Sequence, residues 1–92
     1  MTSEKLNELD MAVVRARASR KYALNEYSKA AGNADSRQLN LENWGQSADE
    51  IKNDHELSEL RAFEAEKKAE YEAESMAVKS AEKAFDEAEA AE

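Results

Sequence analysis

SADEIKNDHELSELRAFEAEKKAEYEAESMAVKSAEKAFDEAEAAE, residues 47–92, is the stretch that decides the fold. It opens with Ser47 and Glu50, whose spacing is that of a capping box, in which the side chain of each residue binds the backbone N–H of the other at the start of a helix. No Pro or Gly follows, and these are the two residues that disfavour a helix interior most strongly. The stretch therefore predicts a helix over about residues 48–90.

The preceding half of the chain predicts a first helix over about residues 4–31. Ser3 is a suitable N-cap, and Gly32 with Asn33 can adopt the left-handed backbone that ends many helices. The connector, residues 32–47, is polar and has room for a short helix over 36–43. The whole chain of 92 residues holds no Pro and only two Gly, so we predict an all-α protein with a single helical domain spanning residues 1–92.

A polar connector between two long helices predicts an antiparallel two-helix hairpin of coiled-coil type. With the turn centred near residue 40, residue 4, where the first helix begins, lies opposite residue 76. The second helix is then the longer one, and residues 77–92 overhang without an intramolecular neighbour.

The predicted second helix has two apolar sides, and a hairpin can cover only one of them. One side is a band of small residues that suits close approach of another helix; its members are Ile51, His55, Ser58, Ala62, Ala65, Ala69, Ala73, Met76, Ser80 and Ala84. The other side, about half a turn away, carries larger side chains: Leu57, Leu60, Phe63, Tyr71, Val78 and Phe85. Leaving these exposed forgoes roughly 1.5–3 kcal/mol of burial for each.

We therefore predict that the larger side chains form a partner or oligomer surface. A homodimer that becomes a helical bundle is the commonest solution, and a different protein is the alternative. On this interpretation Val78→Asp and Phe85→Asp weaken association and leave the helicity of the monomer largely intact. The first helix carries a weaker second stripe of its own, formed by Met11, Val14, Ala18 and Tyr22.

The charge of the chain is uneven. Residues 1–37 hold seven Lys/Arg and five Asp/Glu, whereas residues 38–92 hold six and sixteen, which together give the net charge of −8. The acidic half disfavours direct binding to nucleic acid or to anionic membranes. The candidate acidic surface consists of Glu70, Glu74, Glu82, Asp86, Glu87 and Glu89.

These features favour a non-enzymatic protein that binds, and in the sharpest version inhibits, a protein partner. A small acidic helical protein suits a phage-type inhibitor that occupies a basic nucleic-acid channel by presenting carboxylates in place of phosphates.

The segment RARASRK, residues 15–21, is the one candidate for direct nucleic-acid binding. Arg17, Arg20 and Lys21 share one sector of the predicted helix. No aromatic residues alternate with them, as base stacking would favour. The preferred interpretation is that these cations pair with carboxylates of the second helix, for which the candidates are Glu56, Glu59, Glu64 and Glu66.

We predict no catalytic residues, no cofactor and no metal site. His55 is the only histidine and Cys is absent. Carboxylates spaced by four residues, such as Glu66 with Glu70, resemble half of a di-iron motif but lack its Glu-x-x-His partner. No apolar run is long enough to span a bilayer and no signal-peptide core is present, so a cytoplasmic protein without a membrane anchor is expected.

The segment ENWGQSADE, residues 42–50, resembles the turn of the WXG100 family of type VII secretion substrates, which have a Trp and a Gly in the turn of a cysteine-free helical hairpin. Trp44 and Gly45 are adjacent here, whereas that family has one residue between them. The resemblance covers the turn alone. It implies a structural or secretion-linked helical hairpin, which we keep as an alternative function.

Overall fold

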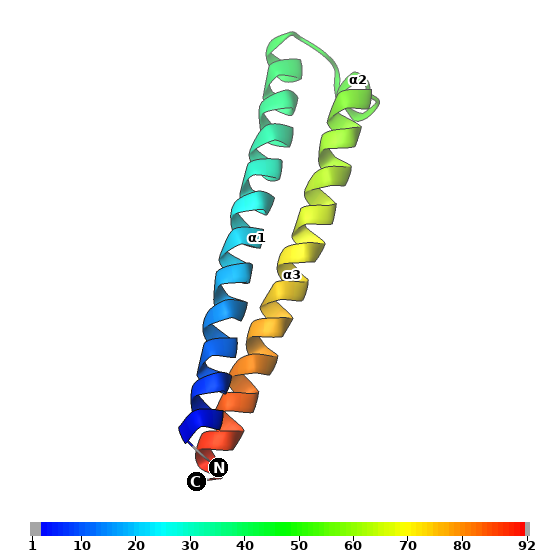
Figure 1. Cartoon of the computed structure of the whole chain (residues 1–92). Coiled ribbons are helices and arrows are strands. Elements are labelled where there is room, and N and C mark those ends of the chain that lie inside the picture. The colour runs from blue at the N-terminus through cyan, green and yellow to red at the C-terminus, as the bar shows by residue number, and fades with distance from the viewer. Residues whose placement is uncertain (1–2, 92) are drawn as a thin grey trace. The chain divides into compact units, whose positions relative to one another are not determined.

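The computed structural model describes residues 3–91. In chain order its helices are α1 (Ser3–Asn43), α2 (Ala48–Lys52) and α3 (His55–Ala90), and no strand occurs in this part of the chain (Figure 1). The all-α prediction is therefore confirmed. None of the three helices has the length and apolar character needed to cross a membrane.

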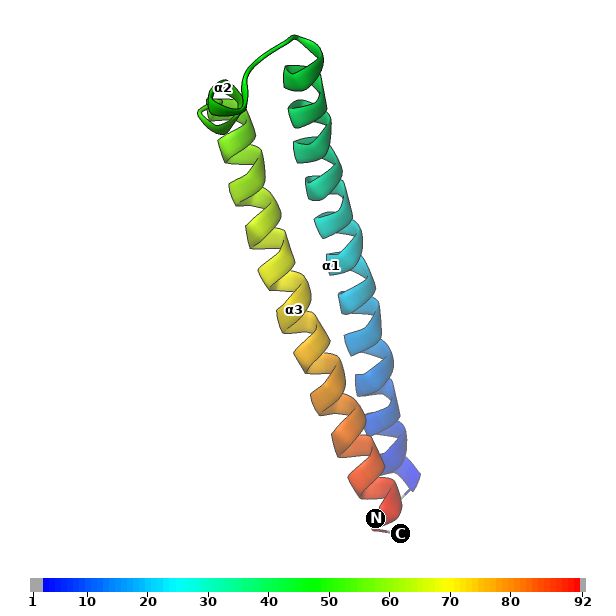
Figure 2. The same ribbon diagram turned by 180° about the vertical axis from the view of Figure 1, so that it is seen from behind.

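The described residues form two compact units. Residues 3–23 and 70–91 belong to unit 1, and residues 24–69 belong to unit 2, so each unit combines a part of α1 with a part of α3. Within each unit these two helical segments lie side by side and run in opposite directions, as the views from both sides show (Figures 1 and 2).

The predicted end of the first helix near residue 31 is wrong, because α1 continues through Gly32 to Asn43. The predicted short helix over 36–43 is simply the last part of α1. A glycine inside a helix costs about 1 kcal/mol relative to alanine. Tertiary contacts outweigh that cost here, because Ala34 and Leu41 are both completely buried beyond the glycine.

The true end of α1 is set by Gly45, whose φ of +80° is the left-handed backbone that glycine adopts without strain. The N–H of Gly45 binds the carbonyl of Glu42 at 3.0 Å, and the N–H of Gln46 binds that of Leu41 at 3.2 Å. This pair of bonds is the Schellman motif, which satisfies the free carbonyls at the end of a helix. The turn therefore follows Asn43 and does not lie near residue 40.

The capping box is confirmed, but the helix that it begins is short. The N–H of Glu50 donates to Ser47 Oγ at 3.2 Å, and the N–H of Ser47 donates to Glu50 Oε1 at 3.1 Å. The resulting α2 ends at Lys52. The single predicted helix over 48–90 is therefore wrong at residues 53 and 54.

Asp54 explains this break. Its Oδ2 accepts the N–H of Leu57 at 2.8 Å, as an N-cap carboxylate does, so a new helix, α3, starts at His55. Asn and Asp are poor in helix interiors and favoured at caps because their side chains bind nearby backbone groups.

The core of unit 2 lies between the end of α1, α2 and the start of α3. Ala34, Leu41 and Leu57 form a buried cluster, and Ile51 and Leu60 pack against it. Ile51 thus explains why α2 lies against the other two helices, although it has only five residues.

Two arginines join α1 to the beginning of α3 in unit 2. Arg37 binds Asp54 through two bonds of 3.1 and 3.0 Å. Arg61 of α3 binds Asp35 of α1 at 2.9 Å.

Unit 1 has a thinner core, in which Val13, Ala23, Val78 and Ala88 are buried. Arg17 of α1 binds Glu82 of α3 at 2.7 Å, so the start of α1 accompanies the end of α3 in this unit. The predicted overhang of residues 77–92 is therefore wrong as far as residue 91, and residue 92 lies outside the described residues. Its cause is the misplaced turn, since a longer α1 reaches the last turns of α3.

Buried and half-buried residues recur at alternating spacings of three and four along both long helices, which is the spacing of a coiled-coil seam. In α1 the seam positions run from Leu6 to Leu41, and in α3 from Leu57 to Ala88. Among the described residues, four of the eight buried apolar side chains are alanines. Helices with alanine at the contact approach closely and leave little volume between them.

Candidate protein-binding surfaces

The predicted partner surface of α3 is mostly used inside the chain. Leu57 and Val78 are buried, and Val78 is only 1% exposed. Leu60, Tyr71 and Phe85 are half-buried seam positions, and only Phe63 is exposed. The interpretation of this stripe as a surface for a second chain is wrong for Leu57 and Val78, because α1 covers the side that the predicted hairpin left open.

The opposite side of α3, the band of small residues, is the outer side. Of its members from Ser58 to Ala84 all are exposed, and Met76 is 62% exposed. Other large apolar side chains also remain outside the seams; with Met76 they are Met11, Val14, Tyr22, Leu24, Leu39, Trp44 and Phe63. The apolar surface available to another protein therefore lies mainly on α1 and at its end.

The end of α1 carries the largest of these side chains. Trp44 is 65% exposed and Leu39 is 55% exposed. The guanidinium of Arg37 lies 5.6 Å from the centre of the Trp44 ring, a cation–π contact that holds the ring on the outside of unit 2. We call Leu39 and Trp44 the tip surface.

The candidate acidic residues divide into two groups. Glu74 and Glu82 are half-buried, and Glu82 is bound to Arg17. Those on the outside of unit 1 are Glu70, Asp86, Glu87 and Glu89. Glu87 is 3.9 Å from Lys83, at the limit of an ion pair between exposed side chains, which contributes little stability. The acidic surface that a partner could contact is thus smaller than the sequence suggests.

The three residues of the candidate basic patch do not present one free surface. Arg17 binds Glu82, Arg20 is half-buried at a seam position, and Lys21 is exposed. The preferred interpretation of pairing with the other helix is correct for Arg17, although its partner differs from the predicted carboxylates. Those carboxylates engage other cations in part, since Glu56 binds Arg37 and Glu64 binds Arg61.

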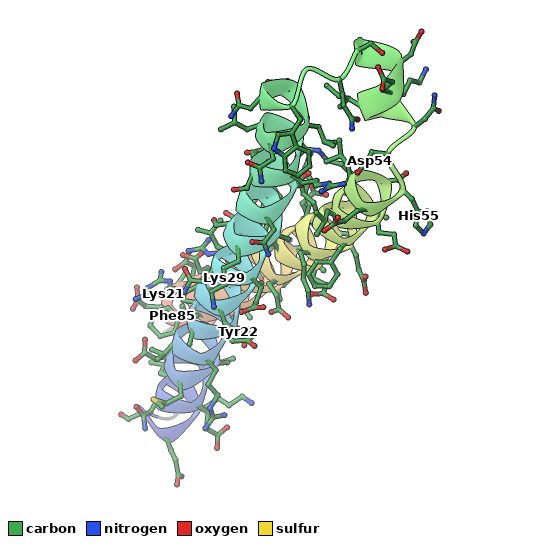
Figure 3. All side chains as sticks on the ribbon, turned by 90° about the horizontal axis from the view of Figure 1, so that it is seen from above. Lys21, Tyr22, Lys29, Asp54, His55 and Phe85 are labelled. Carbon is green, nitrogen blue, oxygen red and sulfur yellow. The ribbon has the colours of Figure 1, made fainter. Side chains whose placement is uncertain are left out.

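Arg37 is the centre of a cluster of charged side chains in unit 2. Besides Asp54, Arg37 binds Glu56 at 3.2 Å. The hydrogen bond from Arg37, reinforced by the Leu57 N–H, lowers the pKa of the Asp54 carboxyl. Asp54 thus caps α3 and ties it to α1 (Figure 3).

We expect the free energy of unfolding of the Asp54→Asn variant to depend less on pH in the acidic range than that of the parent protein. An unfolded Asp titrates near about 3.9, and the folded carboxyl titrates lower. The Asp54 carboxylate therefore contributes fully to the free energy of unfolding when the pH is above the pKa of the unfolded state. This contribution is lost as the pH falls through the pKa of the folded state. Asn keeps an oxygen for the cap but removes the charge. Urea unfolding from about pH 6 to about pH 2 is expected to show the variant weaker at the upper end and equal to the parent at the lower.

Asp49→Asn, which neutralises an exposed carboxylate on α2, is the matched control for this experiment. It is expected to follow the parent protein across the range. A parent and an Asp54→Asn variant separated by the same free energy at every pH contradict the role of the charge.

His55 lies on the outside of unit 2, at the start of α3. Its ring is 89% exposed, lies 3.0 Å from Glu59 and points away from the helices of unit 2 (Figure 3). Over residues 3–91 no group of three or more His, Asp or Glu side chains is placed to hold a metal ion.

Comparison with known proteins adds no further constraint. No family model, no curated protein and no solved structure matches the chain.

Proposed function

We propose that the chain is a non-enzymatic protein–protein interaction module, built as an antiparallel two-helix hairpin and acting in the cytoplasm. The observation that carries the proposal is the exposure of the tip surface, Leu39 and Trp44, in a unit whose own seam is already filled by Leu41 and Leu57. Single exposed apolar residues are normal. A Trp is different, because Trp is the residue type most often found at the energetic centre of a protein interface.

The surroundings of the tip surface indicate the chemistry of its partner. Arg37 contacts the Trp44 ring and is itself bound to Asp54, so the ring is held in position before binding and less entropy is lost on association. Exposed carboxylates lie nearby in sequence, on Glu42, Asp49 and Glu50. A partner that fits this surface has an apolar pocket with a basic rim.

The sharpest form of the proposal is an inhibitor of a nucleic-acid-binding protein. Asp86, Glu87 and Glu89 are exposed on the outside of unit 1 and can stand in for phosphates in a basic channel. The pairing of Arg17 with Glu82 and the half-burial of Arg20 argue against direct nucleic-acid binding by the chain itself.

A secretion-linked helical hairpin is the second candidate function. One observation favours it: Trp44 and Gly45 stand directly at the turn, and Gly45 supplies the left-handed backbone there. Export of the chain to the medium distinguishes this candidate from an inhibitor retained in the cell.

The proposal is tested by affinity capture from the native host with variants of each surface. We expect the double variant Leu39→Ala/Trp44→Ala to weaken retention of the captured partner about thirtyfold or more, the loss typical of an interface hot spot. Phe63→Ala, which removes another exposed aromatic ring of unit 2, is the matched control and is expected to retain it.

The triple variant Asp86→Asn/Glu87→Gln/Glu89→Gln separates the inhibitor version from the general one. If these carboxylates bind a basic channel, the triple variant retains the captured partner less well than the parent protein does. Retention by the parent protein then also decreases as the salt concentration rises. Equal retention of all variants contradicts the proposal.

A further inference from the structure

The outer face of α1 in unit 1 has an apolar centre and opposite charges at its two ends. Met11, Val14, Ala18 and Tyr22 follow one another at spacings of three and four, so they share one face of the helix. At about 100° per residue this face is opposite the seam that contains Val13 and the other buried positions. All four are exposed, and Met11, Val14 and Tyr22 are 41%, 50% and 68% exposed.

The charges on this face change sign along the helix. Glu4 and Glu8 precede the apolar centre, whereas Arg15 and Lys21 lie within or after it, and all four are exposed. Glu8 is 3.7 Å from Lys5, but both side chains are more than half exposed. An exposed pair of this kind holds its partners weakly, so Glu8 can turn toward another molecule at little cost.

A surface that is acidic at one end and basic at the other complements itself when it is turned around. We propose that the outer face of α1 is a homodimer interface, in which the same face of a second copy lies antiparallel across it. With a two-fold axis near residues 12 and 13, Met11 faces Val14 of the partner subunit. Glu8 then lies within one helical turn of Arg15 of the partner subunit on the same flank, and Glu4 lies near Tyr22 of the partner subunit.

The observations favour a second copy over another occupant. A parallel arrangement places like charges together along the whole face, which is unfavourable, whereas the antiparallel one brings Glu8 of each copy close to Arg15 of the partner subunit, twice by symmetry. The inference rests on the proposed role as an interaction module and names the partner of a surface distinct from the tip surface. Lys21 and Tyr22 are labelled in Figure 3.

Charge exchange tests the arrangement. Glu8→Arg and Arg15→Glu each place like charges together at two symmetry-related positions, so each is expected to weaken self-association about tenfold in sedimentation equilibrium. The double variant Glu8→Arg/Arg15→Glu restores the pairing and is expected to return to the parent value. Both positions are exposed, and circular dichroism checks that helicity is unchanged.

Disulfide trapping tests the direction of the second copy, because the chain contains no Cys of its own. A mixture of Met11→Cys and Val14→Cys proteins is expected to form a mixed disulfide under mild oxidation. Tyr22→Cys alone is expected not to crosslink, since the two copies of residue 22 lie about 28 Å apart along the helix in this arrangement.

Three results overturn the inference: a parent protein that remains monomeric at millimolar concentration, a double charge variant no better than the single ones, or efficient crosslinking of Tyr22→Cys to itself. Leu39→Ala/Trp44→Ala is expected to dimerise normally. If the parent protein captures a partner but does not dimerise, this inference alone is rejected. If the parent protein dimerises but the Leu39→Ala/Trp44→Ala variant retains the captured partner as well as the parent does, the proposed function is rejected.

Discussion

Val78→Asp is expected to unfold unit 1. The side chain is 1% exposed, and an unpaired carboxylate at such a position costs about 3–5 kcal/mol. A small core contributes about that much in total. We expect amide exchange in residues 70–91 to accelerate strongly and the ellipticity at 222 nm to fall.

Met76→Asp is the matched control for this substitution, because it lies two residues earlier on the exposed side of α3. It is expected to change stability by no more than about 0.5 kcal/mol. Equal melting curves for the two variants mean that Val78 is not buried in solution. The same experiment distinguishes burial of Val78 in unit 1 from the sequence-based prediction that Val78 lies on a partner surface. That prediction requires Val78→Asp to leave helicity intact.

Leu41→Ala is expected to produce the largest loss among truncations in unit 2. Leu41 is completely buried at the centre of the cluster with Ala34 and Leu57, and removing a buried leucine side chain costs about 2–5 kcal/mol. Chemical unfolding of the variant is expected to begin at lower denaturant, with amide exchange in residues 24–69 accelerated first.

Leu39→Ala makes the same chemical change two residues away, where the side chain is 55% exposed. Because the change in helix propensity is identical, the difference between the two variants reports burial alone. The variants are expected to differ by at least about 1.5 kcal/mol. Equal stabilities contradict the placement of Leu41 in the core.

The features that depend on neighbouring residues were predictable from sequence. The helical class follows from the absence of Pro and the scarcity of Gly, and the capping box follows from the spacing of Ser47 and Glu50. The outer stripe of α1 from Met11 to Tyr22 is visible as a second apolar periodicity. Local patterns of this kind act within one or two turns of helix, where the interacting groups are close in sequence.

The position of the turn was not predictable in this way. Gly32 and Gly45 offer the same local signal, and what distinguishes them is the burial of Ala34 and Leu41 between the two. This burial depends on Leu57, which is distant in sequence. The misplaced turn also caused the wrong predictions of an overhang and of a partner surface. A turn placed too early leaves the end of α3 without a neighbour, so its seam resembles a surface for another protein.

One signal for the break before α3 was present in the sequence. Asn53 and Asp54 are adjacent residues that favour helix ends, and Leu57 lies where its N–H can reach an N-cap carboxylate. The absence of Pro and Gly outweighed this signal. Asp54 also needs Arg37 to hold it in place, and that contact joins residues seventeen apart in the chain.

The alanines of the seams limit the size of the side chains that can be placed between the helices. Ala30 and Ala34 are almost completely enclosed, so a longer side chain at either position pushes the helices apart and costs about 1–3 kcal/mol. Stability therefore cannot be gained by the usual route of enlarging the interior. Selection for a more durable protein has to act on helix ends, charges and outer faces, which are the places where we propose that partners bind.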